Sequence, residues 1–304
     1  MITVDAAIKF IRREAAEHEP FFAVVWFGSP HGPHQALPAD REPYADQPEK
    51  LQHFYGEITA MDRAIGKLRN EIKTLGIQQN TIFWYCSDNG ALPNVGNNGD
   101  RRGHKNRVYE GGLLVPAILE WPAKITKPRK TDVPCSTCDI YPTILDIVGV
   151  HPENQPPLDG VSLVPLIDGR MTQRDKPLGF WHYASQGRRT PSLPWMRELY
   201  DAQQAGRDLG RPERLCLDAG KITKQYPTNR MPGHAAWVDG PWKLHRIEER
   251  KTKQVRFELY NLADDRREAN NLIDEQPERA QRMKSELDTW LRSVIDSLNG
   301  KDYR

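Results

Sequence analysis

The sequence lacks a long hydrophobic run. Its longest apolar stretch extends only from Phe21 to Gly28, whereas a helix that crosses a bilayer needs roughly 20 apolar residues. The N-terminus also lacks the basic region and following apolar region that are typical of a secretion signal. We therefore expect no membrane partner, and the sequence leaves the compartment open.

Cysteine is scarce, and neither sign of charge dominates. Four cysteines in 304 residues do not indicate a disulfide framework. Cys135 and Cys138 form a CxxC pair, but no second pair stands at zinc-site spacing, and the flanking residues are typical of a helix start. The 43 basic and 41 acidic residues give a net charge of +2, too balanced to predict a nucleic-acid surface. A small anionic substrate needs only local positive charge.

Helix and strand patterns alternate in the first part of the sequence. Apolar residues recur at helical spacing in some segments, and short continuous apolar runs in others are typical of buried strands. We expect helices over residues 3–16, 51–75 and 139–148, and strands over residues 21–27, 81–86 and 113–121. This alternation predicts a parallel sheet covered by helices, with a ligand crevice outside the carboxyl ends of the strands.

The sequence falls into three regions. Residues 1–170 contain the alternating helices and strands, which indicate an α/β domain. Residues 171–236 are rich in proline, glycine, arginine and aromatic residues with little periodicity, which predicts surface loops near the substrate rim. Residues 237–304 show two strands, over 237–244 and 257–262, and a final helix with one apolar stripe. The last region therefore predicts a small α+β subdomain.

Three polar segments follow predicted strands. Asp88 and Asn89 supply two hard oxygen ligands of the kind that suits calcium or magnesium, although Asn89-Gly90 taken alone is more typical of a turn. Lys105 lies in a loop of cations and glycines that suits either a tetrahedral oxyanion or plain solvation. His31 is either an unpartnered loop residue or a general acid. Converging at one sheet edge, these residues predict hydrolysis of a phosphate or sulfate ester.

The sequence resembles the sulfatases, within the alkaline-phosphatase-like superfamily, through five motifs in family order. They are the strand ending in Pro-His-x-Pro at residues 21–33, the helix pattern at 55–62, Ser-Asp-Asn-Gly at 87–90, the Gly-x-Lys and Tyr-Glu-Gly-Gly block at 103–116, and the Glu-Leu-Tyr-Asn-Leu strand with its tail at 258–272. The resemblance implies a parallel or mixed sheet flanked by helices, and an enzyme that hydrolyses sulfate esters.

The resemblance also implies a role for each matching residue. By analogy with the family, Asp88 and Asn89 ligate a calcium ion. Lys105 binds a sulfate oxygen, and His31 contacts the sulfate and assists the leaving group.

Two parts of the family pattern are absent. The Cys/Ser-x-Pro-x-Arg motif that yields the formylglycine nucleophile does not occur, and the adjacent aspartates Asp264 and Asp265 lie too late in the chain to be the family's early calcium ligands. The resemblance begins midway through the family fold. We therefore expect a sheet incomplete at its N-terminus, a partial calcium site, and a chain that is inactive alone and pairs with an N-terminal fragment or with itself.

Other functions stay open beside sulfate-ester hydrolysis. One is a non-catalytic scaffold or module that binds sulfated glycans, and another is a phosphoester or phosphonate-ester hydrolase of the same superfamily. The expected partner is a sulfated small molecule or sulfated glycan. Aromatic residues in the loop-rich region either line the rim of its site or serve as packing anchors: Trp181, His182, Tyr183 and Trp195.

Overall fold

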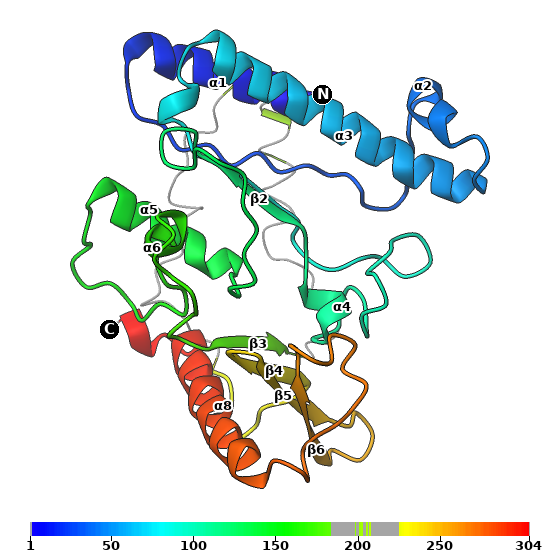
Figure 1. Ribbon diagram of the computed structural model, residues 1–304, viewed down its shortest axis with the longest axis vertical. Helices are drawn as coiled ribbons and strands as arrows, with labels where there is room; N and C mark the ends of the chain where they lie inside the picture. The colour runs from blue at the N-terminus through cyan, green and yellow to red at the C-terminus, as the bar shows by residue number, and fades with distance from the viewer. Residues whose placement is uncertain are drawn as a thin grey trace. The chain divides into compact units, whose positions relative to one another are not determined.

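The computed structural model describes residues 2–183, 198, 201, 202, 205, 207 and 225–303 (Figure 1). The chain divides into two compact units. Unit 1 contains residues 1–100 and 111–132, and unit 2 contains residues 101–110 and 133–304. Most of the expected loop segment lies outside the described residues, including Trp195 and Cys216.

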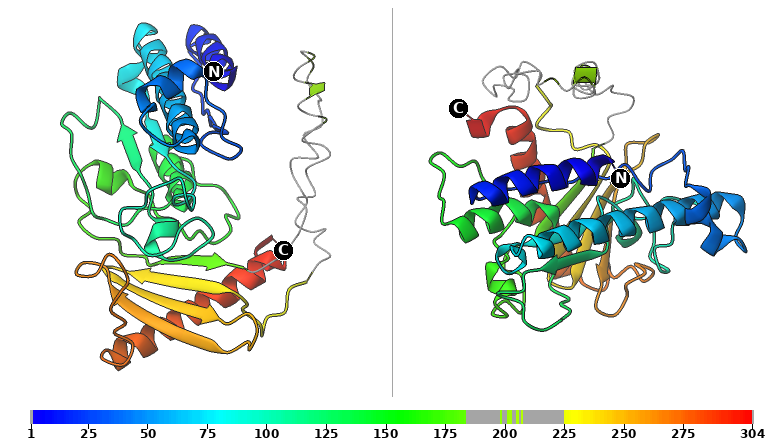
Figure 2. Two further views of the ribbon diagram at one scale, coloured as in Figure 1. Left: turned by 90° about the vertical axis from the view of Figure 1, so that its right-hand side faces the viewer. Right: turned by 90° about the horizontal axis from the view of Figure 1, so that it is seen from above.

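Two long helices form the core of unit 1. Helix α1 (Ile2–Glu17) and helix α3 (Glu49–Thr74) lie side by side (Figures 1 and 2). Their apolar stripes meet because the buried residues recur at helical spacing on both: Val4, Ile8, Ile11, Ala64, Leu68 and Ile72. Gly76 ends α3 with a φ of 72°, as expected for a C-terminal glycine. Of the helices that the structure describes, none is both long and apolar enough to span a membrane.

The strand expected over residues 21–27 does not form. This segment is extended but pairs with no strand among the described residues. Alternate side chains pack against the core of α1 and α3, whereas Phe22, Val24 and Trp26 are 66%, 58% and 84% exposed. An apolar run fixes the preference for an extended backbone, but a strand also needs a neighbour to accept and donate its backbone hydrogen bonds.

The remaining part of unit 1 contains a short ladder. Strand β1 (Phe83–Cys86) pairs with β2 (Ala117–Glu120) antiparallel, so the parallel pairing that we expected is not found among the described strands. The expected strand over residues 113–121 is also shorter. Helix α4 (Glu110–Leu113) occupies its beginning, and Pro116, which has no N–H to donate, precedes β2. The shorter elements of unit 1 are α2 (Pro38–Arg41) and the 3₁₀ turns Glu42–Tyr44 and Gln78–Asn80.

Helix α5 (Ile140–Val148) of unit 2 is held by a buried ion pair. Asp139, fully buried, accepts two hydrogen bonds of 2.8 Å from the guanidinium of Arg174 and caps the 3₁₀ turn Thr137–Asp139. Gly149 ends α5 with a φ of 70°, which confirms the expected helix end. The short α6 (Val164–Ile167) follows.

Four antiparallel strands and one helix form the rest of unit 2. The sheet order is β3 (Leu178–His182), β4 (His234–Asp239), β5 (Trp242–Glu248) and β6 (Val255–Asn261). Two expectations were wrong here: β3 lies where loops were expected, and the single strand expected over residues 237–244 is a hairpin. Gly240, with a φ of 56°, turns the chain between β4 and β5. The final helix, α8 (Pro277–Leu298), agrees with the sequence and precedes the 3₁₀ turn Lys301–Tyr303.

The two faces of this sheet differ in polarity. One face packs against α8 (Figure 2) through apolar side chains, including Trp237, Leu244 and Leu259, which are paired across the strands. Because side chains alternate along a strand, Lys243 and His245 project to the opposite face, where both are fully buried. The sheet therefore buries polar groups on the face away from its helix.

Candidate functional site

The two predicted metal ligands follow β1 in unit 1. Asp88 is exposed, and its carboxylate has no hydrogen bond or ion pair among the described residues. The side-chain amide of Asn89 donates to the Gly90 carbonyl at 3.1 Å, which leaves the amide oxygen as an acceptor. The Ser87 hydroxyl donates to the Asn89 carbonyl at 3.2 Å. The turn thus presents two oxygen ligands.

A close approach of two backbone segments explains why this turn has glycine at position 90. Its N–H donates to the Gly112 carbonyl at 2.9 Å, which joins the turn to α4. A Cβ at position 90 would lie 2.0 Å from the carbonyl oxygen of Gly111, closer than any real Cβ contact. Glycine is therefore required at position 90 by a close backbone approach, which holds the turn that carries Asp88.

His31 lies in a loop that its neighbour His34 holds in place. His31 is exposed, and its Nδ1 lies 2.9 Å from the Gly32 carbonyl oxygen. His34 Nδ1 lies 3.0 Å from a carboxylate oxygen of Glu57 on α3, and the N–H of Gln35 donates to the other oxygen at 2.7 Å. Sequence reasoning missed Glu57. Its signal was a carboxylate on the otherwise apolar stripe of α3.

Lys105 lies in unit 2, in the loop of residues 101–110. The N–H of Arg107 donates to the His104 carbonyl at 2.9 Å, and Asn106 has a φ of 70°, so Lys105 lies within a tight turn. The ammonium group of Lys105 has no carboxylate partner among the described residues. It is therefore available to an anion.

The structure places the four predicted residues in different units. His31, Asp88 and Asn89 belong to unit 1, and Lys105 belongs to unit 2. Their convergence in one site stays a prediction. In the described part of the chain, no group of three or more His, Cys, Asp or Glu side chains could hold a metal ion by itself.

The loop that carries Lys105 is tied to the sheet of unit 2 at its first end through Arg102. The guanidinium of Arg102 donates to the Tyr260 hydroxyl at 2.9 Å and to Glu258 at 3.3 Å. It also lies 4.0 Å from the ring of Tyr109, a cation–π contact. The Tyr109 hydroxyl in turn donates to Glu258 at 2.8 Å. Glu258 is thus a shared acceptor.

The last residue of the loop, Glu110, is tied to a second buried group. Its N–H donates to one oxygen of Glu268 at 2.6 Å, and its carboxylate accepts from Lys243 at 2.7 Å. Glu268 is fully buried and also forms an ion pair with Lys243, at 3.1 Å. The same carboxylate lies 2.7 Å from His245 Nε2. His245 Nδ1 lies 2.8 Å from His234 Nε2. We use the name loop anchor for the group around Glu258 and the group around Glu268 together. Its residues are Arg102, Tyr109, Glu258 and Tyr260 in the first group, and Glu110, Lys243, Glu268, His245 and His234 in the second.

Burial and hydrogen bonding shift the pKa values of the loop anchor. Burial, assisted by the Glu258 carboxylate, raises the pKa of Tyr109 to about 12. Burial alone would raise the pKa of Glu258, but hydrogen bonds from Tyr109, Arg256 and Tyr260 outweigh it and lower that pKa. Burial lowers the pKa of His245, and with nearby His245 and Lys243 it lowers the pKa of His234 to about 3. Both imidazoles are therefore neutral near pH 7.

We expect the histidine pair to make unit 2 sensitive to mild acid. An unfolded histidine takes up a proton near pH 6.5, whereas folded His234 does so only near pH 3. The contribution of His234 to the free energy of unfolding is therefore fully present above pH 6.5. Below that pH it falls by about 1.4 kcal/mol per pH unit, which amounts to about 2 kcal/mol at pH 5. The raised pKa of Glu268, caused by burial, acts in the opposite direction. Urea unfolding at pH 7 and pH 5 measures this difference.

Histidine variants test the source of this pH dependence. The variant His234→Gln should lose much of the difference between pH 7 and pH 5. The exposed His151 of the same unit supplies the control His151→Gln, which should keep the full difference. An equal pH dependence in both variants would contradict the assignment.

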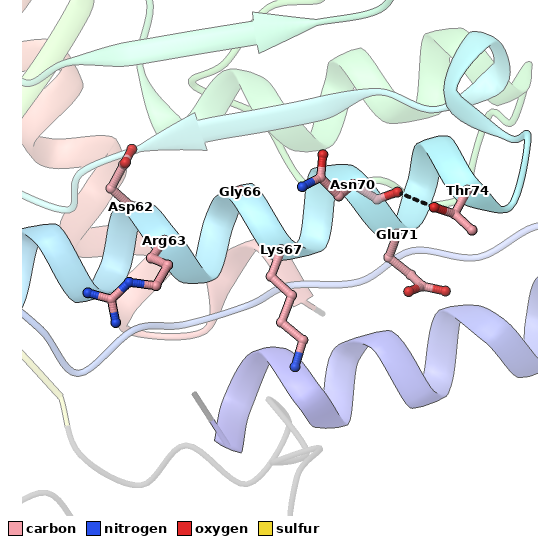
Figure 3. A pocket seen from close by; sticks show the side chains of 7 residues that line it. All are labelled: Asp62, Arg63, Gly66, Lys67, Asn70, Glu71 and Thr74. Carbon is pink, nitrogen blue, oxygen red and sulfur yellow. Dashed lines mark hydrogen bonds between the residues drawn. The ribbon is translucent and has the colours of Figure 1, made fainter.

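A cavity of about 530 Å³ lies along α3 in unit 1 (Figure 3). Three of its charged residues are already paired: Lys67 lies 2.5 Å from Asp5, Glu71 lies 2.7 Å from Arg12, and Arg63 pairs with Asp40. Gly66 lies between these side chains on the same helix. Because the cations of the cavity have carboxylate partners, it offers no local charge to an anionic substrate.

Two further sequence features have structural explanations. Cys135 and Cys138 both precede α5, and partial desolvation raises the pKa of both thiols, that of Cys135 to about 11. Both are therefore protonated near neutral pH. The indole N–H of Trp181 donates to the Pro232 carbonyl at 2.8 Å, and its ring contacts Tyr183. These aromatics have packing contacts, while Trp195 lies outside the described residues.

Comparison with known proteins identifies related sequences. Residues 1–150 match the model of the family described as Sulfatase. Steryl-sulfatase of Homo sapiens is 33% identical over 195 residues, which are 60% of this chain and 32% of that protein. The endo-4-O-sulfatase of Bacteroides thetaiotaomicron is 25% identical over 301 residues, 91% of this chain and 52% of that protein. The chain thus spans about half the length of these relatives, or less.

Solved structures show the same fold. The crystal structure of Ps i-CgsB in complex with k-i-k-neocarrahexaose aligns with a TM-score of 0.73 at 20% identity, covering 100% of this chain and 61% of that one. A putative sulfatase, yidJ, from Bacteroides fragilis aligns with a TM-score of 0.68 at 18% identity, covering 100% and 60%. The fold is therefore the alkaline-phosphatase-like fold of sulfatases, and the chain, through residues 1–150, belongs to the sulfatase family.

Proposed function

We propose that this chain forms the metal-binding and sulfate-binding part of an enzyme that hydrolyses sulfate esters. In this proposal, Lys105 binds a sulfate oxygen and His31 assists the leaving group. Asp88 and Asn89 contribute ligands to a calcium ion. The attacking formylglycine is not part of this sequence, so we expect the chain alone to be inactive. The substrate is a sulfated small molecule or sulfated glycan.

The observation that carries the proposal is the sulfatase match of residues 1–150, which includes all four of these residues. The local geometry supports it, because Lys105 lies in a turn with an ammonium group that no described carboxylate neutralises. A lysine ammonium is a compact point charge that suits an anionic oxygen. Hydrogen bonds to charged groups contribute about 1.5–3 kcal/mol.

The donor chemistry of Asp88 and Asn89 fits calcium, but their number does not complete a site. Calcium takes about 6–8 oxygen ligands, and these two side chains offer a free carboxylate and an amide oxygen. A bound calcium ion would supply positive charge beside the sulfate group. Because the described residues provide only part of the ligand set, we assign no catalytic step to the ion.

Binding of inorganic sulfate tests the proposal on the full chain. We expect isothermal titration calorimetry to detect sulfate binding that Lys105→Ala weakens by about 10-fold to 100-fold, the loss of one charge-assisted hydrogen bond. Lys251→Ala, which removes an exposed lysine of the same unit, should leave the affinity unchanged. Equal affinities in the wild-type chain and Lys105→Ala would contradict the proposal.

Two further measurements complete the test. Added calcium should increase the sulfate affinity of the wild-type chain and have no effect on Asp88→Ala, because the variant lacks the carboxylate ligand. Inorganic phosphate should compete more weakly than sulfate. Tighter binding of phosphate would favour a phosphoester or phosphonate-ester hydrolase instead.

A further inference from the structure

The loop that carries Lys105 is fixed at both ends by residues far away in the sequence. Arg102 at its start donates to the Tyr260 hydroxyl at 2.9 Å and to the Glu268 carbonyl at 3.2 Å. At its end, the Glu110 carboxylate accepts a hydrogen bond from the Lys243 ammonium at 2.7 Å, and the Glu110 N–H donates to the Glu268 carboxylate at 2.6 Å. Lys105 lies in the turn between these two ends.

The ties on the sheet side come from buried groups on rigid elements. Lys243 and Tyr260 lie on the central and edge strands β5 and β6, where they are 0% and 2% exposed. Glu268, also fully buried, lies in the segment after β6. Long polar side chains are rarely buried without a compensating role. Here their partners are the ends of one loop.

We propose that this buried polar face of the sheet positions Lys105 for sulfate, an inference that rests on the proposed function. Arg102, Tyr109, Tyr260 and Glu268 are positioning residues, which act through the backbone of the loop. A loop that is ordered before its ligand arrives loses less conformational entropy on binding. The affinity of Lys105 for sulfate therefore depends on hydrogen bonds made away from the anion.

Tyr260→Phe is the most direct test. The substitution is neutral and keeps the ring, so it cannot change the charge that sulfate meets, yet it removes the hydroxyl that Arg102 and Glu258 share. We expect the dissociation constant for inorganic sulfate, measured by calorimetry on the full chain, to rise about 3-fold to 10-fold, as for one lost hydrogen bond. Hydrogen exchange of the amides of residues 103–108 should become faster.

A matched control separates positioning from general stability. Thr143 is buried in α5 of the same unit, where its hydroxyl bonds the Asp139 carbonyl at 2.6 Å. Thr143→Ala should lower the melting temperature without changing sulfate affinity or exchange in residues 103–108. Tyr109→Phe, which removes the other hydroxyl bonded to Glu258, should reproduce the effect of Tyr260→Phe and decides the question if that variant does not fold.

The outcomes distinguish this inference from the proposed function. If Lys105→Ala weakens sulfate binding but Tyr260→Phe and Tyr109→Phe do not, the positioning role is wrong and the proposed function stands. If Thr143→Ala weakens binding as much as they do, the effect is one of stability and the positioning role is again wrong. If Lys105→Ala has wild-type affinity, both proposals fail.

Discussion

Lys243→Met is expected to destabilise unit 2 by about 3–5 kcal/mol, the cost of leaving a buried charge without its partner. Lys243 is fully buried on β5, and its ammonium group lies 2.7 Å from Glu110 and 3.1 Å from Glu268. Methionine preserves most of the side-chain volume, so the loss reports charge and not a cavity. Urea-induced unfolding followed by circular dichroism measures the free energy.

An exposed lysine supplies the control for this prediction. Lys301 pairs with Asp296 at 2.6 Å, but its side chain is 56% exposed, and such surface pairs contribute about 0–1 kcal/mol. Lys301→Met should therefore cost less than about 1 kcal/mol. Adding Glu268→Gln to Lys243→Met should recover part of the stability, because it removes one of the two unpaired carboxylates. A loss in Lys243→Met no greater than in Lys301→Met would show that the buried pair is not needed.

Gly90→Ala is expected to have a comparable effect in unit 1. The added Cβ would lie 2.0 Å from the carbonyl oxygen of Gly111 and 2.8 Å from the Cα of Gly112. Both atoms belong to backbone, which cannot rotate away as a flexible side chain can. The turn must separate from α4, with loss of the 2.9 Å hydrogen bond between them. We expect a loss of about 3 kcal/mol or more, since overpacking typically costs 1–3 kcal/mol and backbone must also move.

The same substitution in a helix gives the opposite sign. Gly66 lies within α3, and a Cβ there would meet nothing within 4 Å. Gly66→Ala should therefore stabilise the chain by up to about 1 kcal/mol, the difference in helix propensity. Thermal unfolding of the two variants compares them directly. If Gly90→Ala melts with the wild-type chain, the close approach at position 90 does not constrain the fold.

The helices were predicted well because each carries its own signal. The apolar stripes of α1, α3 and α8 are local patterns, and Gly76 and Gly149 end their helices as their sequence positions indicate. The strands were predicted less well. The Asp-Gly pair before Pro241 is itself a hairpin signal, but the apolar residues on both sides of it resembled one continuous strand.

The candidate site could be predicted only in part. Motifs identified Asp88, Asn89, Lys105 and His31, since each follows or lies near a recognisable element. The residues that hold their loops were missed, because the partners are distant in sequence: Glu110 meets Lys243 across 133 positions, and no local pattern encodes that pairing. A lysine and a histidine flanking Leu244 on an apolar strand were the available signal.

The assignment of residues 101–110 to unit 2 has a consequence for dividing the chain. A protein expressed as residues 1–132 alone would keep Arg102, Tyr109 and Glu110 but lose every partner that they have on the sheet. The complementary piece would contain the buried charges of Lys243 and Glu268 without Glu110, their partner in the loop. We therefore expect the two pieces to associate and fold when mixed, because the ten-residue loop of the first binds the sheet of the second. Limited proteolysis of the intact chain at this division should likewise leave the two pieces associated.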